Sequence, residues 1–537
     1  MKSISALLIG LLAFSACAKT PAPGPAAEEI TPAEIDAHIR FLSDDLLEGR
    51  SLGGRGHDIA ALYQETRFRE FGLEAAFADG SYRQTFDLRG CAPDPQAGIE
   101  LLGTKTRVPL ALTRDFVVKS HRSDIPAAVE GGIVYAGYLI QAPERGWDDI
   151  KGLDLKGKII LCEINEPGNA PGGIFDGEDM TYYGRWPYKF EKAAELGALG
   201  CLIIHDTKGA AYGFEVVQNS WLRENFFLPD KPQLLAFQGW ISGEAAERIL
   251  AAVGIDRAAV RAKAERSDFA PIPLGARARV RQKPAFRTVP VMNVAAIRRA
   301  KPAPGPERYI VFSAHYDHLG RNADLAGDQI FNGAVDNCSA SATLLALARF
   351  YARTASDPEI GLIFAAVTAE EELMLGSDYF ARHLPVPAGS ILADLNLEMT
   401  NVWGETEDVY TIGGKHSDLD GIAARAAANL GLRYIPERNG ELGFFFRSDQ
   451  VSFARNGIPS VWLHEGVVSK FKGPDFMPGR HADYQKNKYH KPADEIEADW
   501  DYRGTIQIAR WAREIVSLLA ADPALPQFKP TSSFRRK

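Results

Sequence analysis

The chain has 537 residues and a formal net charge of -8, with 61 Lys and Arg side chains mixed among 69 Asp and Glu side chains. This length exceeds what one ordinary hydrophobic core organises, so we expect two domains, or one domain that carries a large insertion. The mixed charges exclude a strongly basic nucleic-acid-binding surface and a polybasic membrane patch, and we expect a neutral or peptide-like partner.

The chain begins with the pattern of an export signal. A lysine precedes an apolar run over residues 4–14, and small residues with Cys17 follow. This run is too short for a transmembrane span but fits a signal peptide, so we expect residues 1–18 to direct export. The segment "FSAC" resembles a bacterial lipobox, which would make Cys17 the lipidated first residue of the mature chain. Plain cleavage after Ala18 is the alternative, because Ala16 and Ala18 fit the small-x-small rule.

An exported chain would work in the periplasm, at the outer membrane through a lipid on Cys17, or as a secreted protein. Residues 19–28 are rich in Pro and Ala and are predicted to form a tether. The other cysteines contain no CxxC pair, so no thiolate metal site is expected. Cys162 and Cys201 lie in apolar, strand-like runs and are expected to be buried thiols.

The next segment is predicted to be helical and then extended. Thr31 is the expected cap of a first helix with Pro32 at its first position, and a second helix covers about residues 59–71. Between them, the glycine-rich "LLEGRSLGGRG" is predicted to be a connector, because no strand leads into it as a phosphate-binding loop requires. Residues 82–125 alternate in polarity and indicate strands.

A separate pattern of strand, turn, strand, helix and strand begins near residue 129, in "AAVEGGIVYAGY", "GLDLKGKIILCEI" and "FEKAAELGALGCLIIHD". It indicates a unit with its own apolar elements. The "DLKGKIIL" turn and strand, followed by a helix that ends in "GALGCLI", resemble the protease-associated domain, which is non-catalytic in the families that carry it. We bound this inserted domain at residues 125–275 and expect His205 and Asp206 to be a surface pair.

From about residue 285, strand and helix patterns alternate, which predicts an α/β domain with a mostly parallel sheet flanked by helices. We expect this domain to comprise residues 29–124 and 276–525, followed by a tail at 526–537. The expected strands are "TVPVMNVAAIRR", "YIVFSAH", "IGLIFAAVT", "SILADLNLEM" and "IPSVWL", and the principal helices cover 337–351, 417–430 and 500–519.

Polar residues follow the predicted strands, where ligands of parallel sheets gather. His315 ends one strand, and Asp317 can hold its imidazole so that the other ring nitrogen is free for a metal. Glu370 and Glu371 follow another strand and point in different directions, so one should bind metal while the other acts as general base. Two imidazoles and three carboxylates would suit a pair of zinc ions; the further candidates are Asp336, Glu398 and His490.

Five short segments follow one another in the order "SAHYDHLG", "GAVDN", "AEE", "NLEM" and "YHKPAD". They resemble segments of the cocatalytic dizinc aminopeptidase family, the M28 kind of zinc peptidase. This family includes bacterial leucyl aminopeptidases and glutamate carboxypeptidase. The resemblance implies a zinc exopeptidase fold with an inserted protease-associated domain. It also implies these roles: one zinc ion bound by His315, Asp336 and Glu398, the other by Asp336, Glu371 and His490, with Glu370 as general base and Asp317 as the catalytic aspartate beside His315.

Two positions depart from the family pattern. Glu398 stands in "NLEM" where the family has "NLDM", so one ion is expected to be shifted or held less tightly. Cys338 stands in "DNCSA" where the family has "DNASG". A thiol there is a third candidate metal ligand, but we expect it to face the core, because it opens an apolar helix.

The resemblance implies an exported aminopeptidase that hydrolyses the N-terminal bond of peptides. Phe444, Phe445 and Phe446 in "GELGFFFRSDQVSF" would help form an apolar substrate pocket, with at least one in the core. A carboxypeptidase or dipeptidase, with Arg447 as the nearest cation for a terminal carboxylate, and a glutaminyl-cyclase-like enzyme remain alternatives on the same scaffold. A receptor-like, non-catalytic homologue is a further alternative. The inserted domain is expected to restrict the entrance without supplying catalytic groups.

Overall fold

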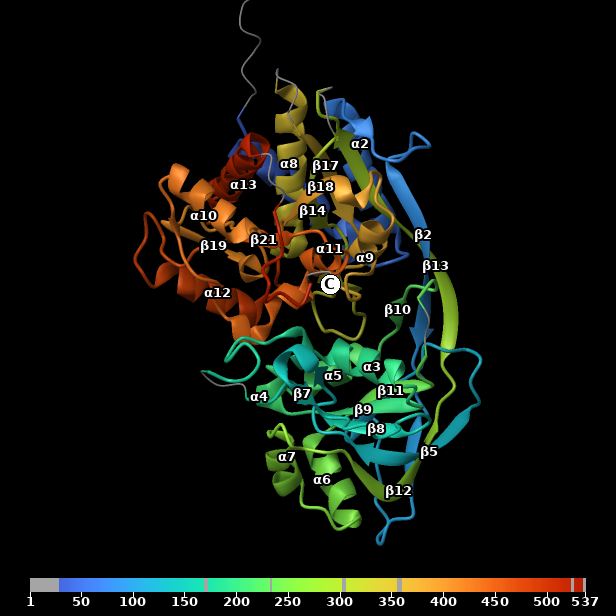
Figure 1. Ribbon diagram of the computed structural model, residues 1–537. Coiled ribbons are helices and arrows are strands. Elements are labelled where there is room, and N and C mark those ends of the chain that lie inside the picture. Colours follow the sequence, from blue (N-terminus) through green and yellow to red (C-terminus); the bar gives the residue numbers. More distant parts are fainter. Residues whose placement is uncertain are drawn as a thin grey trace, which may run out of the picture.

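The computed structural model describes residues 29–168, 172–231, 234–301, 306–354, 360–522 and 526–534. The predicted signal, Cys17 and the tether lie outside these residues. The described chain forms two units joined by two long strands (Figure 1). The larger unit is built on a ten-stranded sheet, and the smaller unit, residues 98–281, is built on a seven-stranded sheet.

None of the helices in the described ranges combines the length and the apolar character needed to cross a membrane.

The larger sheet has the order β10-β2-β13-β17-β14-β18-β21-β19-β20, with β1 paired to β13. Its four central strands are parallel, as expected, and three of them are buried along their whole length. Strand β13 pairs antiparallel with β17 and β2, and β19 pairs antiparallel with β21, so the expectation of a mostly parallel sheet is wrong there. The reason is topological, because β2 and β13 pair as a ribbon with the smaller unit inserted between them. The edge strand β20 again pairs in parallel with β19. The main strands are β2 Arg83–Ala92, β13 Ala285–Arg298, β17 Gly361–Val367, β14 Tyr309–His315, β18 Ile391–Asn396, β21 Ser460–Glu465 and β19 Asp408–Ile412.

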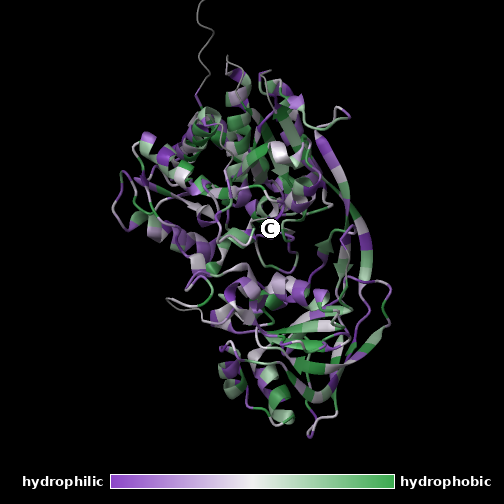
Figure 2. Ribbon diagram, viewed as in Figure 1, coloured by the Kyte–Doolittle hydropathy of each residue, from purple (hydrophilic) through white to green (hydrophobic). Residues whose placement is uncertain are grey.

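The central strands alternate their apolar side chains between two cores. Ile310, Phe312 and Ala314 face one core, whereas Val311 faces the other. On the first face pack α1 Pro32–Leu42, α2 Arg55–Phe71, α8 Ala340–Arg353, α10 Leu419–Asn429 and α13 Arg503–Ala521, and on the second α9 Leu375–Arg382 and α11 Gln450–Arg455. Figure 2 shows the apolar colour concentrated in these central strands. Burial on both sides explains why the strands are continuous apolar runs.

Local sequence determines the first two helices. The Thr31 hydroxyl accepts a hydrogen bond from the Glu34 N–H at 3.2 Å, which caps α1 as predicted. Helix α2 ends at Gly72, whose φ of 79° is the left-handed conformation that glycine adopts without strain. This helix begins four residues before the expected start.

The smaller sheet has the order β3-β12-β5-β8-β9-β11-β4, with an apolar core on each face. Strands β3 and β4 precede residue 125 and β12 extends past 275, so sheet membership differs from the expected limits of the inserted domain. These strands belong to the smaller sheet because they pair with segments far away in the chain. The local sequence pattern of a strand does not show which strand it pairs with. The bounds are β3 Gly98–Leu102, β4 Phe116–Lys119, β5 Ala128–Tyr135, β8 Ile159–Glu163, β9 Gly200–Ile204, β11 Phe237–Ile241, β12 Ile272–Arg281, α3 Trp186–Glu195, α5 Phe214–Trp221, α6 Gly243–Ala252 and α7 Arg257–Ala264.

Shorter elements complete the two units. Strand β10, Asn225–Phe227, leaves the smaller unit and pairs with β2 in the larger sheet. The others are β1 Glu74–Ala75, β6 Gln141–Ala142, β7 Trp147–Asp148, β15 Gly320–Arg321, β16 Ile330–Phe331, β20 Arg433–Tyr434, α4 Thr207–Ala210 and α12 Phe476–Asn487.

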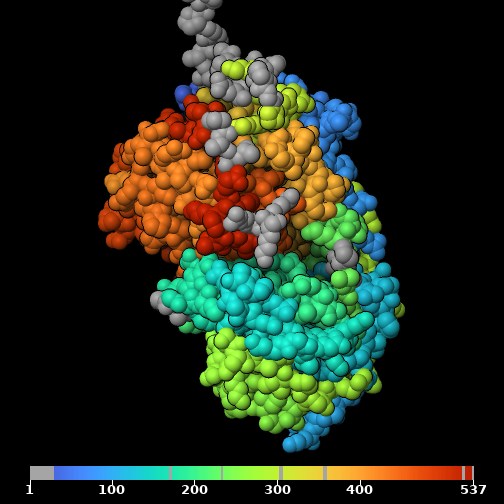
Figure 3. Space-filling model, in the orientation of Figure 1, coloured from blue at the N-terminus to red at the C-terminus, as the bar shows by residue number. Residues whose placement is uncertain are grey.

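The two units dock through the segment that precedes α3. The Met180 N–H donates to the Gly440 carbonyl at 3.0 Å, and Lys415 pairs with Asp179 at 3.0 Å. The Tyr182 ring lies 5.6 Å from the Phe446 ring. Figure 3 shows the resulting contact between the teal surface of the smaller unit and the orange and red surface of the larger one. The smaller unit therefore lies against the loop that contains Arg447.

Candidate dimetal site

The parallel strands end at one edge of the larger sheet and bring the first group of candidate ligands together there. His315 is the last residue of β14 and is fully buried. Its Nε2 lies 3.4 Å from Asp336 Oδ1 and 3.3 Å from Glu398 Oε1. Glu398 follows β18 by two residues, and Asp336 lies in the turn before α8. These three side chains could hold one metal ion.

A second group lies on the other side of Asp336. Its Oδ2 is 3.2 Å from His490 Nε2, which is 3.3 Å from Glu371 Oε2. The two oxygens of one carboxylate thus face different imidazoles. This is the geometry required of a carboxylate that bridges two ions.

His318 joins this second group and was not among the predicted residues. Its Nδ1 lies 2.7 Å from Glu371 Oε1, and ligand atoms of His318, Asp336 and Glu371 all lie within 4.8 Å of one another. Its Nε2 is buried and has no hydrogen-bond partner in the described part of the chain. The segment "HYDHLG" contains this second histidine, which was a usable sequence signal.

Asp317 connects the two strand ends that carry the site. Its Oδ1 lies 3.7 Å from His315 Nδ1 and accepts the Glu370 N–H at 3.2 Å. Its Oδ2 accepts the Glu371 N–H at 3.4 Å. The carboxylate therefore positions both the imidazole and the pair of glutamates, as a residue beside a metal ligand commonly does.

The charges of the site reinforce one another. Burial would raise the pKa of Asp336, but the imidazoles of His315 and His490 hold it well below its ordinary value. Burial would lower the pKa of His490, but Glu371 and Asp336 raise it to about 9. Acidic groups that stabilise a proton here would also stabilise a dication. The nitrogen and oxygen donors fit zinc, which accepts histidine and carboxylate ligands.

Glu370 lies at the edge of the first group, with its Oε2 3.8 Å from His315 Nε2. Burial raises its pKa well above the ordinary value, and the charges of Glu398 and Glu371 add to the effect, whereas His315 opposes it. A carboxyl group in these surroundings readily takes up a proton, which is what a general base at this position must do.

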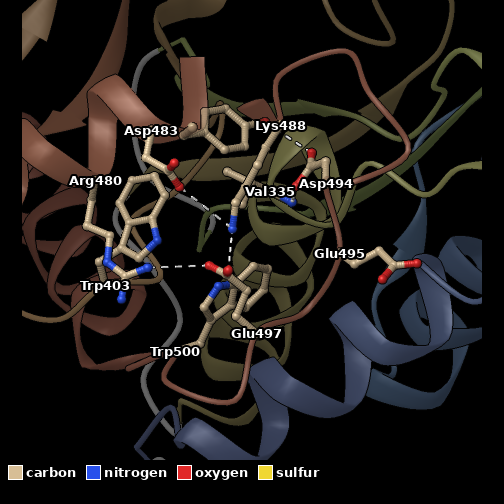
Figure 4. A pocket seen from close by; sticks show the side chains of 10 residues that line it. Val335, Trp403, Arg480, Asp483, Lys488, Asp494, Glu495, Glu497 and Trp500 are labelled. Carbon is tan, nitrogen blue, oxygen red and sulfur yellow. Dashed lines mark hydrogen bonds and ion pairs between the residues drawn. The ribbon is translucent and has the colours of Figure 1, made fainter. Parts of the chain in front are cut away.

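Two buried side chains support the Asp336 turn from behind. Asp494 accepts the Val335 N–H at 3.0 Å and the Asp336 N–H at 3.1 Å, and it receives the Tyr484 hydroxyl at 3.0 Å. Figure 4 shows Asp494 beside Val335 at the wall of a narrow pocket. Asp494 is the last letter of the quoted "YHKPAD", but no role was predicted for it.

Arg50 is the second support and comes from the loop predicted to be a plain connector. It is 1% exposed. Its guanidinium donates to the carbonyls of Tyr316, Leu42, Asn332 and Gly333, at 2.9, 2.6, 2.6 and 3.3 Å. One side chain thereby ties the loop after His315 to the turn before Asp336.

The two departures from the family pattern have clear structural settings. Glu398 receives the Ser448 hydroxyl on Oε2 at 2.7 Å, so its longer side chain is held at both oxygens. Cys338 packs in the core, as expected, and burial raises the pKa of its thiol to about 12. Such a thiol stays protonated and is a poor metal ligand.

Other predicted residues lie apart from the ligand groups. Phe445 and Phe446 are 2% and 5% exposed and pack in an apolar cluster of the larger unit, while Phe444 is half-buried beside them. His205 is buried, with Nε2 3.0 Å from the Tyr212 carbonyl, so the expected surface pair with Asp206 is wrong. His205 directly follows β9, and the rings of Phe214 and Trp240 pack against its imidazole.

Several known proteins resemble this chain in sequence or in fold. Residues 293–516 match the model of peptidase family M28. Over 111 residues the chain is 32% identical to a "Probable zinc metalloprotease" of Pyrenophora teres f. teres (strain 0-1); the aligned segment is 20% of this chain and 23% of that protein. Over 218 residues it is 27% identical to Aminopeptidase YwaD of Bacillus subtilis (strain 168); the aligned segment is 40% of this chain and 41% of that protein. The chain thus matches less than half the length of these curated relatives.

Among solved structures, an aminopeptidase from Aneurinibacillus sp. strain AM-1 aligns with 95% of this chain and 98% of its own, with a TM-score of 0.54 and 20% identity. This likeness shows that the two chains share a fold.

Proposed function

We propose that this chain is a zinc aminopeptidase that removes N-terminal residues from peptides, because residues 293–516 match the model of peptidase family M28. The observation that carries the proposal is the pair of ligand groups that share Asp336. One zinc ion would be held by His315, Asp336 and Glu398, and the other by Asp336, Glu371 and His490. In this arrangement His318 orients Glu371 through the 2.7 Å contact.

When bound, zinc would polarise the scissile carbonyl and lower the pKa of the attacking water. Glu370 would take the proton from that water and return it to the leaving amine, a role that its raised pKa favours. Asp317 would keep His315 and the Glu370 backbone in place. Asp336 would stay ionised throughout, because its two imidazole neighbours stabilise the charge.

The proposal extends to the rest of the chain. The smaller unit would be a protease-associated domain, supported by the "DLKGKIIL" pattern and by its separate sheet. The N-terminal sequence supports export, with a lipid on Cys17 as the proposed anchor. Peptides outside the cytoplasm would then be the substrates.

Metal analysis combined with a matched substrate panel tests this function. The purified protein should contain two zinc ions per chain and hydrolyse free aminoacyl amides but not their N-acetylated forms, because an aminopeptidase requires a free N-terminus. Preferential hydrolysis of N-acetylated dipeptides would instead establish a carboxypeptidase. Two bound metals without hydrolysis of any substrate would favour a receptor-like protein.

A further inference from the structure

The turn between β17 and α9 carries both glutamates of the candidate site, Glu370 and Glu371. It runs from Thr368 to Gly376, at the start of α9, and its two ends meet: a Cβ atom placed on Gly376 would lie 1.9 Å from the Thr368 carbonyl oxygen. Only glycine permits so close an approach. The positions of the two carboxyl groups therefore depend on how firmly this closed turn is held.

Three residues of this turn have a left-handed backbone although none of them is glycine. The φ angles are 55° at Ala369, 66° at Leu373 and 55° at Met374. This conformation is unfavourable for a residue with a Cβ atom and persists only where the surrounding structure holds it. Ala369 directly precedes Glu370 and is fully buried in an apolar cluster. The turn therefore needs support from contacts outside itself.

Asn293, in β13, makes such contacts with both ends of the turn. Its side chain is fully buried. Its Oδ1 accepts the Thr368 N–H at 3.0 Å, and its Nδ2 donates to the Gly376 carbonyl at 2.9 Å. Nδ2 also donates to Gln84 Oε1 on the neighbouring strand β2 at 2.9 Å, which fixes the orientation of the amide. One side chain thus ties the beginning and the end of the turn to the large sheet.

A second buried side chain reaches the turn from α2. His57 is fully buried, and its Nε2 lies 2.7 Å from the Thr368 hydroxyl oxygen. This hydrogen bond supports the beginning of the turn. Asn293 differs from His57 because it binds the two ends together, which is what a closed turn with an unfavourable backbone requires.

We propose that Asn293 is a positioning residue that holds this strained turn, and with it Glu370 and Glu371, in the conformation that the reaction requires. Asn293 acts through the backbone of the turn and touches neither the substrate nor a metal ion. The inference rests on the proposed function and adds a residue to it. A displacement of a reacting group by about 1 Å can cost roughly 100-fold in rate, so a clamp on the turn is a clamp on catalysis.

Steady-state kinetics of Asn293→Ala at saturating zinc test this role. The variant should lower kcat by roughly 10- to 100-fold and change KM by less than about threefold, because Glu370 acts on the water and not on the substrate. Asn293→Asp keeps the acceptor for the Thr368 N–H and loses the donor to Gly376, so it should show the same kind of loss if Asn293→Ala does not fold. A wild-type kcat in either folded variant, even with a lower free energy of unfolding, would overturn the proposal.

Asn165→Ala is the matched control. The Asn165 side chain is also buried and also holds a turn, in the smaller unit: its Oδ1 accepts the Glu166 N–H at 2.8 Å, and its Nδ2 donates to the Gly209 carbonyl at 3.0 Å. Its removal costs the fold a similar pair of hydrogen bonds and should leave kcat and KM unchanged. A loss of kcat as large as that of Asn293→Ala would show that general destabilisation reduces the activity, and would overturn the proposal.

Ala369→Gly tests the strain of the turn separately. Glycine adopts the φ of 55° without the penalty that a Cβ atom brings, so the turn needs less support. Added to Asn293→Ala, this substitution should raise kcat by roughly fivefold. Ala366→Gly, within the extended strand β17, removes the same methyl group without relieving strain and should not raise kcat. Recovery by neither substitution, or by both alike, would overturn the proposal.

A zinc titration separates failure of this inference from failure of the proposed function, because it does not depend on turnover. Competition with a chelator should show that Asn293→Ala loses roughly tenfold or more in zinc affinity, since Glu371 moves with the turn, and that Asn165→Ala loses none. If the wild type hydrolyses no substrate but the affinity still falls in Asn293→Ala alone, the aminopeptidase function fails and the positioning role stands. Equal zinc affinity in the wild type and Asn293→Ala would overturn the positioning role.

Discussion

Glu370 and Glu371 are neighbours in the chain, yet their surroundings shift their pKa values in opposite directions. Burial acts to raise both. For Glu370 the nearby Glu398 and Glu371 add to this, whereas for Glu371 the charges of His490 and His318 reverse it. One carboxyl group therefore suits proton transfer and the other suits metal binding. At the scale of single residues, this asymmetry is the strongest argument for two distinct roles.

Glu370→Gln should retain both metals and the fold but lower kcat by about 10² to 10⁴-fold, because it removes the proton acceptor and leaves every ligand in place. Metal analysis and steady-state kinetics measure the two effects separately. Glu371→Gln is the control and should lose metal. Near-normal turnover in Glu370→Gln would contradict its assignment as general base.

Asp494→Asn should weaken metal binding by about 10-fold or more, because Asp494 holds the Val335 and Asp336 amides that aim the bridging carboxylate. A competition titration with a zinc chelator measures this. Asp499→Asn provides a control, since Asp499 pairs with Arg480 on the more exposed side of the same region. Equal zinc affinity in both variants would show that Asp494 does not position the site.

At the scale of elements, the connector between α1 and α2 supports the site through Arg50. Arg50→Met should reduce the free energy of unfolding by about 2–4 kcal/mol, because four buried carbonyls lose their donor. Denaturant unfolding measures the change. Arg40→Met, which removes an exposed pair with Asp36, should cost less than about 1 kcal/mol. A similar small loss in Arg50→Met would refute the structural role of that loop.

The turn after β19 contains a histidine that should make the fold sensitive to acid. Burial lowers the pKa of His416 to about 3, and Lys415 adds to this, so the folded chain keeps the imidazole neutral. The unfolded chain takes up this proton near pH 6.5. The contribution to stability is therefore complete above pH 6.5 and declines as the pH falls towards 3.

His416→Phe keeps an aromatic ring against Phe445 and Phe534 and removes the titrating group. Between pH 7 and pH 5 the wild type should lose about 2 kcal/mol more stability than the variant. Denaturant unfolding in the presence of a chelator measures this without a contribution from metal release. Parallel losses in the two proteins would rule out His416 as the source.

At the scale of the whole molecule, the two units contact each other next to the candidate metal site. Strand β10 of the smaller unit pairs in the larger sheet, and Arg223 pairs with Glu372 at 3.3 Å, directly after Glu370 and Glu371. The smaller unit was expected to cover the entrance without supplying groups to the site.

Metal removal tests the molecule as a dimetal enzyme. Dialysis against a chelator should abolish hydrolysis and added zinc should restore it, because the ligand groups hold the ions without covalent attachment. Asp336→Ala should not recover, since both ligand groups lose a member. Full activity with less than one metal ion per chain would contradict the two-metal mechanism.

The sequence by itself determined the central strands, the helices at both ends, and the order of His315, Asp336, Glu371, Glu398 and His490. These follow from local periodicity and from short motifs at strand ends, which need no knowledge of distant contacts. Only the tertiary structure revealed the supporting roles of Arg50 and Asp494. Their roles depend on contacts between segments far apart in the chain, such as the 266 positions that separate Arg50 from the Tyr316 carbonyl it binds. Backbone pairing with distant segments likewise placed β3 and β4 in the smaller sheet.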